Sequence, residues 1–234
     1  MLCRDEFLTK PLIKKLIVGL KKKGPKRKKR KAVDLKSLKR INKAAKTYFK
    51  NDTDILLFQT VAAMMLFGLF RVSELLGDKA LGIQSLQREQ LKLTKDLLTI
   101  SIAEYKHSKG QFSEVQITSQ NSKYICPVNL LEKYLYRRGS QEGPLFVDNK
   151  QIPLTKQKFS RWLKNCCKVA KINPPYTSHS FRIGGANLAA QLGRSDAEIK
   201  ILGRWKSNAN NLYYRKTNPL STKCNLSSQK AGSK

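Results

Sequence analysis

The residues best suited to chemistry are concentrated late in the chain, within the range Thr177–Arg215. His179 and Arg182 are three positions apart, and such a pair lies on one face when the segment is helical. Both side chains can bind and neutralise a phosphate. Tyr213 and Tyr214 follow in the same range, and a tyrosine hydroxyl can act as a covalent nucleophile. Together these residue types suggest nucleophilic attack on a phosphate group.

The stretches between these residues contain cues to backbone structure. Gly184 and Gly185 follow the His–Arg pair directly, where the chain can come close to another backbone. A short apolar-periodic segment, Ala197–Leu202, leads to Gly203–Trp205, which reads Gly-Arg-Trp. A polar turn over Lys206–Asn211 then precedes the tyrosines.

The overall charge restricts the class of partner. Lysine and arginine number 47 against 16 acidic residues, which gives a net charge of +31 in a chain of 234 residues. A balance this basic implies a polyanionic partner, either nucleic acid or an anionic membrane surface. The apolar fraction of 40% suffices for a core and argues against global disorder. No segment has the roughly 18 consecutive apolar residues of a membrane span, since the best candidate, Ile55–Phe70, is interrupted by Gln59.

Cysteine and histidine usage indicates the compartment. The five cysteines are odd in number and show no Cys-x-x-Cys spacing, which favours a reducing intracellular compartment. The N-terminus carries charges where a secretory signal would be apolar, so we expect no such signal. With His107 and His179 as the two histidines, we do not expect a zinc site.

Helical periodicity predicts two helices before residue 50, separated by a basic run. Residues 5–20 form a short amphipathic pattern. The run 21–31 is almost entirely basic and has three compatible interpretations: a solvated linker, a phosphate-binding strap and a nuclear-import patch. A second helix is expected over Asp34–Tyr48, with Asp34 as its N-cap. Its buried side would consist of Leu35, Leu38, Ile41 and Ala45.

A long apolar helix is expected from about Ile55 to Leu76. Because it is hydrophobic on all sides, we place it at the centre of the core. It carries Arg71 and Glu74 near its C-terminal end. From the residues alone, Arg71 also fits an arginine that snorkels from an apolar helix to solvent.

A change of period to two predicts a β-hairpin over residues 91–118, with Ser108–Gly110 at its tip. On its own, Lys109 at that tip is typical of a solvated lysine. Two further helices are predicted, over Pro127–Arg138 and over Thr155–Val169, and Thr155 is the expected cap of the second. A short extended piece is predicted between them, over Pro144–Val147.

These elements, in this order, resemble the catalytic domain of the tyrosine recombinases, the phage-integrase superfamily. A helix ends in G-L-F-R-V-S-E-L-L, a hairpin carries a lysine, and H-S-F-R, G-R-W and a tyrosine follow. The motif sequences H-S-F-R-I-G-G-A and L-G-R-W-K-S are most similar to those of the eukaryotic recombinases of cryptons and DIRS-like retrotransposons. The resemblance implies a mainly helical α+β fold, in which a small antiparallel sheet packs on a helical core.

The same resemblance implies a reaction and the residues that perform it. A tyrosine hydroxyl would cut one DNA strand and form a 3′-phosphotyrosyl link, which a free 5′-hydroxyl then attacks, without a metal or other cofactor. Arg71 and Arg182 would bind the non-bridging phosphate oxygens. His179 would bind the phosphate and assist proton movement at the tyrosine, and Lys109 would protonate the leaving 5′-oxygen as general acid, although Lys106 is close by.

The remaining site residues follow from the resemblance as well. Trp205 would donate its indole N–H to the phosphate and pack the tyrosine helix, and Glu74 would orient the site from behind. Either tyrosine can be the nucleophile. The spacing from Trp205 in the broad superfamily favours Tyr214, whereas the eukaryotic wording, Tyr-x-Arg, favours Tyr213. We prefer Tyr213.

The resemblance also predicts domains and partners. Full-length members clamp DNA between this domain and an N-terminal helical domain. Residues 1–32 are therefore interpreted as a remnant of that domain with a basic linker, 33–217 as the catalytic domain and 218–234 as a flexible tail. We expect binding to double-stranded DNA, assembly of four copies on it, no membrane association and a nuclear location. The expected DNA-binding residues of the linker are Lys26, Arg27, Lys28, Lys29 and Arg30.

Two other functions compete with recombination. A non-catalytic DNA-binding remnant of a mobile-element recombinase would keep the charge and lose strand cleavage. A protein that binds anionic membranes would explain the charge but not the order of the motifs. A covalent DNA adduct that survives SDS distinguishes the recombinase from the binding module.

Overall fold

A computed structural model describes residues 31–205 except 79, 81, 104–111 and 123, together with five isolated helical positions between 11 and 19. The chain divides into two compact units, Met1–Arg30 and Lys31–Lys234, and the elements named below all lie in the second. Several predictions fall outside the described residues: the basic run up to Arg30, the hairpin tip with Lys109, the tyrosine pair and the tail from Asn218. The predicted domain boundaries stay a prediction.

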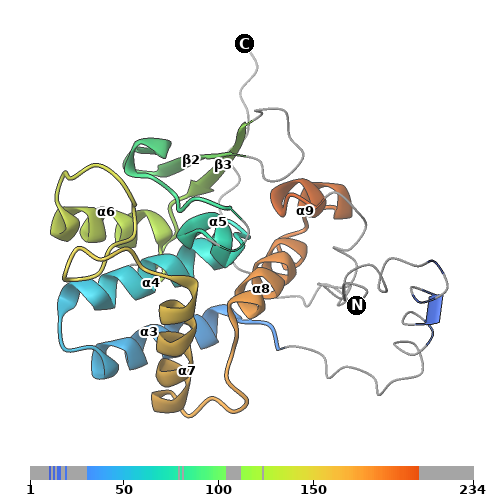
Figure 1. The fold of residues 1–234 in the computed structure, drawn as a ribbon, viewed down its shortest axis with the longest axis horizontal. Coiled ribbons are helices and arrows are strands. Elements are labelled where there is room, and N and C mark those ends of the chain that lie inside the picture. Colours follow the sequence, from blue (N-terminus) through green and yellow to red (C-terminus); the bar gives the residue numbers. More distant parts are fainter. Residues whose placement is uncertain are drawn as a thin grey trace, which may run out of the picture. The chain divides into compact units, whose positions relative to one another are not determined.

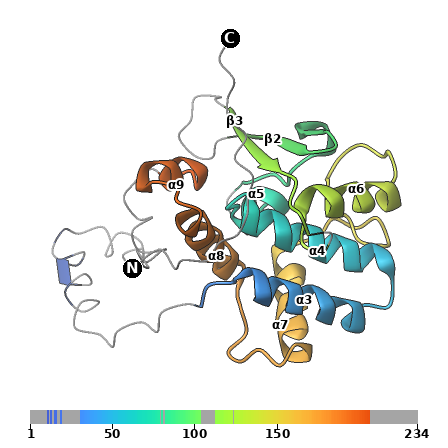
Figure 2. The same cartoon turned by 180° about the vertical axis from the view of Figure 1, so that it is seen from behind.

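The body of the unit is a set of helices around α4 (Asp52–Phe67). Helices α3 (Leu35–Tyr48) and α7 (Lys156–Val169) lie on one side of α4, and the sheet lies on the other (Figures 1 and 2). Helix α6 (Pro127–Arg138) also packs on α4. The fully buried side chains of α4 include Leu57, Phe58, Val61, Met64 and Met65. A helix that is apolar on every face forms the centre of a core, as predicted.

Side-chain caps set the starts of the predicted helices. Asp34 accepts a hydrogen bond from the Ser37 backbone N–H at 2.7 Å, so α3 begins where the sequence indicates. Thr155 caps α7 in the same way, and α6 begins with Pro127, whose missing N–H costs nothing there. The prediction that Leu35 lies on the buried side of α3 was wrong. Leu35 is exposed, because the first turn borders a groove of about 350 Å³ rather than the core.

The predicted continuous helix from Ile55 to Leu76 is wrong, because the chain breaks after Phe67. Gly68 ends α4, Leu69 has a φ of 50°, and a second helix, α5 (Val72–Leu76), begins after Arg71. A left-handed residue ends helical hydrogen bonding and turns the chain. The break leaves the carbonyl oxygens of Gly68 and Leu69 available to side chains from elsewhere.

The predicted hairpin is confirmed and belongs to a three-stranded antiparallel sheet in the order β1-β2-β3. Strands β2 (Leu97–Ala103) and β3 (Phe112–Thr118) pair from Leu97 opposite Thr118 onward. The first predicted run is divided by a turn, so that β1 (Leu91–Leu93) pairs back onto β2 after the short 3₁₀ helix η2 (Arg88–Gln90). The inward-facing side chains of the hairpin include Leu98, Ile100, Ile102, Val115 and Ile117.

Helices α8 (Ser178–Gln191) and α9 (Asp196–Leu202) complete the described part of the chain. The two glycines of α8 permit the close approach that the sequence predicts. A Cβ atom on Gly184 would lie 1.9 Å from the Val33 carbonyl oxygen, and one on Gly185 would lie 2.1 Å from that of Leu66. Such distances are impossible for any side chain, so α8 rests on the chain before α3 and on the end of α4. Within the described residues, no helix has the length and apolarity needed to cross a bilayer.

Candidate active site

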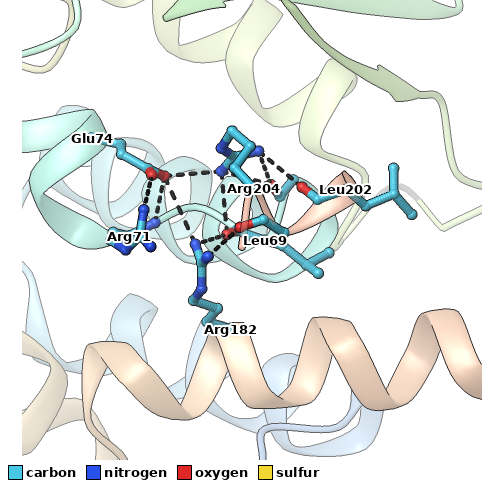
Figure 3. A network of polar contacts seen from close by, with 8 residues as sticks. Leu69, Arg71, Glu74, Arg182, Leu202 and Arg204 are labelled. Carbon is cyan, nitrogen blue, oxygen red and sulfur yellow. Dashed lines mark hydrogen bonds and ion pairs between the residues drawn. The ribbon is translucent and has the colours of Figure 1, made fainter. Parts of the chain in front are cut away.

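The carboxylate of Glu74 is the meeting point of three arginine side chains (Figure 3). Its Oε1 lies 2.8 Å from Arg71 Nη1, and its Oε2 lies 2.9 Å from Arg204 Nη2 and 4.0 Å from Arg182 Nη1. Arg71 precedes α5, Arg182 projects from α8, and Arg204 follows α9. Residues far apart in sequence thus meet at the break between α4 and α5.

Local structure explains why Glu74 points into this site. Arg71 is the N-cap of α5 and Glu74 is its third residue, so the Glu74 Oε2 accepts a hydrogen bond from the Arg71 backbone N–H at 2.7 Å. This reach of an N3 glutamate back to the N-cap is half of a capping box. The carboxylate is therefore held by its own helix and by the arginines together.

Glu74 is ionised in spite of its burial. Its side chain is 4% exposed, and burial raises the pKa of a carboxyl group. The nearby charges of Arg204 and Arg182, with hydrogen bonds from Arg204 and the Arg71 backbone, outweigh burial and hold the pKa of Glu74 below its ordinary value of 4.5. One negative and three positive charges leave a surplus of positive charge at the site, which favours an anionic ligand.

Arg182 is fixed in the interior. Its side chain is 2% exposed, Nη1 donates to the Leu69 carbonyl at 2.6 Å, and Nη2 donates to the Gly203 carbonyl. The guanidinium lies over the Trp205 ring, 4.4 Å from its centroid, at a cation–π distance. Trp205 itself packs in a small apolar cluster with Leu69 and side chains of α8 and α9. The Trp205 ring therefore packs against the Arg182 guanidinium and holds it in place.

Arg71 differs from Arg182 in its exposure. The Arg71 side chain is 51% exposed, so its guanidinium can meet a ligand from solvent while it stays paired with Glu74. His179 is partly buried in the first turn of α8, one turn before Arg182, as the spacing predicted. The structure thus brings together Arg71, Glu74, Arg182 and Trp205, with His179 on the same helix as Arg182.

Comparison with known proteins places this arrangement in a family. A model of the phage integrase family matches residues 31–219, which is most of the chain. The chain belongs to the phage integrase family. A search among curated protein sequences returned no match.

Solved structures of similar fold agree with this membership. XerH site-specific recombinase bound to a palindromic difH substrate is 16% identical, with a TM-score of 0.59 over 80% of this chain and 50% of that chain. XerA recombinase is 20% identical, with a TM-score of 0.61 over 80% and 61%. A lambda integrase tetramer bound to a Holliday junction is 15% identical, with a TM-score of 0.56 over 79% and 49%. At these identities the likeness concerns the fold, and this phage integrase family member spans about half the length of the XerH chain.

One residue of this integrase-family site was missed by sequence reasoning. Arg204 bonds Glu74, yet the Gly-Arg-Trp sequence was interpreted through its tryptophan alone. The sequence did contain a signal for Arg204: it is a basic residue directly before Trp205, in a segment already assigned to the site. The predicted Lys109, Tyr213 and Tyr214 lie outside the described residues. Among the described residues, no group of three or more His, Cys, Asp or Glu side chains is arranged to hold a metal ion.

Two basic helix faces were also missed. Neither α3 nor α7 contains an acidic residue, and the two helices pack against each other. Their exposed cations include Lys36, Lys39, Lys43 and Lys46 on α3 and Arg161, Lys164 and Lys168 on α7. We refer to these seven residues as the α3–α7 basic surface. Basic side chains at helical spacing without acidic neighbours suit contact with a polyanion.

The buried charge of Glu74 leads to a prediction about stability. In the Glu74→Gln variant, the free energy of unfolding at pH 7 is expected to be about 3 kcal/mol lower, because three arginines lose their buried counter-charge. The folded-state pKa of Glu74 is depressed below 4.5, so its stabilising effect is complete above that pH and is lost as the pH falls through the folded-state value. Urea unfolding should therefore show a constant difference from pH 7 to about 5 that shrinks in more acidic solution.

The matched control for this prediction is Glu132→Gln, which removes an exposed carboxylate from α6. We expect that variant to unfold like the parent protein at every pH. A Glu74→Gln variant that is as stable as the parent at pH 7 would show that the carboxylate does not hold the arginines.

Proposed function

We propose that this chain is the catalytic domain of a site-specific recombinase, which breaks and rejoins double-stranded DNA through a tyrosine nucleophile. One observation carries the proposal. Four of the residues expected around one scissile phosphate, Arg71, Glu74, Arg182 and Trp205, come from distant parts of the sequence and converge in a member of the phage integrase family.

In the proposed reaction, the Tyr213 hydroxyl oxygen attacks the scissile phosphorus while the bond from phosphorus to the 5′-oxygen breaks. Lys109 supplies a proton to that oxygen, and the tyrosine loses its own proton with assistance from His179. The product is a 3′-phosphotyrosyl link and a free 5′-hydroxyl. Attack by the 5′-hydroxyl of another strand reverses these steps and restores the phosphodiester, so that neither water nor an energy source is consumed.

The two arginines have different parts in this proposal. Arg71 is half exposed and can donate directly to a non-bridging oxygen, where negative charge gathers in the transition state. One such donor is worth about 3 to 4 kcal/mol of transition-state stabilisation. Arg182 is buried beneath the site and bonded to backbone carbonyls, so it supplies positive charge and fixes the position of its neighbours.

Several further points belong to the proposal. The similar XerH and lambda integrase structures contain DNA, and the latter contains a tetramer, which supports DNA as partner and assembly of four copies. The wording of the His-Ser-Phe-Arg and Gly-Arg-Trp motifs supports an origin in a crypton-like or DIRS-like mobile element. With the basic run 21–31 it also supports a nuclear location. Residues 1–32 would then be a linker and part of a DNA-clamping domain.

The decisive experiment uses the full chain and a nicked suicide substrate of randomised sequence, which releases a short fragment after cleavage and so prevents rejoining. We expect a protein–DNA adduct that survives SDS. If DNA is bound but no adduct forms on any substrate, the chain is a non-catalytic DNA-binding remnant of a recombinase.

DNA affinity of the full chain is predicted to fall steeply with salt. Each phosphate contact adds about 0.9 to the slope of log K against log salt concentration, so we expect a slope of several units. Replacing Lys39 and Lys43 of the α3–α7 basic surface with Gln should lower the slope by about 1 for each lost contact. The control is Lys133→Gln on α6, where Glu132 is the neighbour in sequence. A slope near zero, measured by fluorescence anisotropy, would contradict the phosphate contacts.

A further inference from the structure

Arg204 is a charged group of the described site to which the proposed reaction assigns no part. It follows α9 between Gly203 and Trp205, in a left-handed backbone conformation with a φ of 53°. Its side chain is 15% exposed and turns back toward the break between α4 and α5. A non-glycine residue in this conformation is uncommon, and it directs the side chain away from the path of α9.

The Arg204 guanidinium fills the gap between the two helices. Its Nη2 lies 2.9 Å from Glu74 Oε2 and 3.3 Å from the Leu69 carbonyl oxygen, and its Nη1 lies 3.0 Å from the Leu202 carbonyl and 3.3 Å from that of Gly68. The Phe70 ring lies beneath it, 4.9 Å from centroid to Cζ. One side chain thus fastens the end of α4, the start of α5 and the end of α9.

The carboxylate of Glu74 is shared between its two sides. Oε1 accepts from the Arg71 guanidinium, whereas Oε2 accepts from Arg204 and from the Arg71 backbone N–H (Figure 3). The Arg71 side chain is 51% exposed. Within the described residues, its guanidinium is held by the ion pair with Glu74. The orientation of the Arg71 guanidinium therefore depends on where Glu74 is held. Besides the capping bond from the Arg71 backbone, Glu74 is held by the Arg204 side chain.

We propose that Arg204 is a positioning residue, which fastens Glu74 to the break between α4 and α5 and through Glu74 holds Arg71 where a DNA phosphate would bind. The identity of the ligand, a DNA phosphate, rests on the proposed function. The coupling between Arg204 and Arg71 does not depend on that function. The same tripeptide also supplies the Gly203 carbonyl and the Trp205 ring to Arg182, so Gly203–Trp205 acts as one clamp on both arginines.

The coupling predicts how Arg71 moves when Arg204 is changed. With ¹⁵N-labelled full chain, the Arg71 guanidinium signals can be assigned by their loss in Arg71→Lys. In the parent protein we expect slow rotation about the Arg71 Nε–Cζ bond, because Glu74 holds one end. In Arg204→Met the rotation rate should rise severalfold, and single-turnover cleavage of the suicide substrate should fall about 10- to 100-fold, the scale known for residues that orient a metal ligand. DNA affinity should stay within about twofold, since the Arg204 side chain is largely buried.

The matched control is Arg194→Met, which removes an arginine that pairs with Glu198 at the same distance of 2.9 Å but on the exposed face of α9. It should alter neither Arg71 rotation nor cleavage. If Arg204→Met does not fold, Arg204→Lys decides, because an ammonium group reaches Glu74 but not the Gly68 and Leu202 carbonyls at once, and Arg71 rotation should still rise measurably.

Unchanged Arg71 rotation in whichever of these variants folds would overturn the inference. A parent chain that forms no DNA adduct would instead refute the proposed function, and the rotation measurement would still test the coupling. A rise in Arg71 rotation with no loss of cleavage in an active chain would show that the coupling exists but does not serve the reaction, which also overturns the proposal.

Discussion

The Tyr213→Phe variant is expected to bind DNA with the affinity of the parent chain and to form no covalent adduct. Phenylalanine keeps the aromatic ring but lacks the hydroxyl oxygen, which is the atom that bonds to phosphorus when the strand is cut in the proposed reaction. A tyrosine hydroxyl has an ordinary pKa of about 10, so at neutral pH it must lose its proton during the attack. The proposed reaction cuts the strand with this oxygen alone, so the expected loss is complete.

The measurement is SDS gel electrophoresis of the full chain with labelled suicide substrate, with DNA affinity measured in parallel. Tyr214→Phe is the matched control, because it makes the same chemical change one residue away. We expect it to keep the adduct. If the adduct is lost in Tyr214→Phe and kept in Tyr213→Phe, the nucleophile is the neighbouring tyrosine and the proposed reaction stands with that change. If both variants keep the adduct, the tyrosine mechanism is wrong.

The structure shows which features of the fold short sequence patterns can predict. Helices α3, α6 and α7 begin at residues whose side chains or rings act on the backbone within a few positions, such as Asp34, Pro127 and Thr155. The hairpin of β2 and β3 follows from strict alternation. These signals are local, so no knowledge of distant contacts is needed to interpret them.

The break between α4 and α5 was not predictable in the same way. Gly68 was its single local signal, within a run of strong helix formers. What favours the break is distant in sequence. The freed carbonyls of Gly68 and Leu69 receive hydrogen bonds from Arg204 and Arg182, more than a hundred residues later. A local pattern cannot contain that compensation, because it depends on where α8 and α9 pack.

The same reason explains the outcome for the site. Arg71, Glu74, His179, Arg182 and Trp205 were singled out through motif wording, and the described geometry brings four of them into direct contact. The wording did not reveal that Arg182 is buried and Arg71 exposed, nor that Arg204 completes the charge around Glu74. Burial and pairing arise from tertiary packing, which no spacing along the chain records.

The contrast in burial between the two arginines leads to the second large effect. Arg71→Ala is expected to lower single-turnover cleavage by about 10²- to 10³-fold, the scale of one lost donor to a charged transition state. Its stability should change by less than about 1 kcal/mol, because the arginine is half exposed and Glu74 keeps two other partners. Arg182→Ala should instead cost about 3 to 5 kcal/mol of unfolding free energy, since a buried charge is removed and its carbonyl partners and Trp205 lose their contact.

Urea unfolding and single-turnover cleavage on the same preparations separate the two effects. Arg137→Ala is the matched control for Arg71→Ala, because Arg137 is 52% exposed and also pairs with a carboxylate, that of Asp52, at 3.4 Å. It should change neither quantity. If Arg71→Ala destabilises the protein as much as Arg182→Ala while the folded fraction cleaves normally, Arg71 is a structural arginine that snorkels from the end of an apolar segment. A donor to the scissile phosphate would then have to be sought elsewhere in the chain.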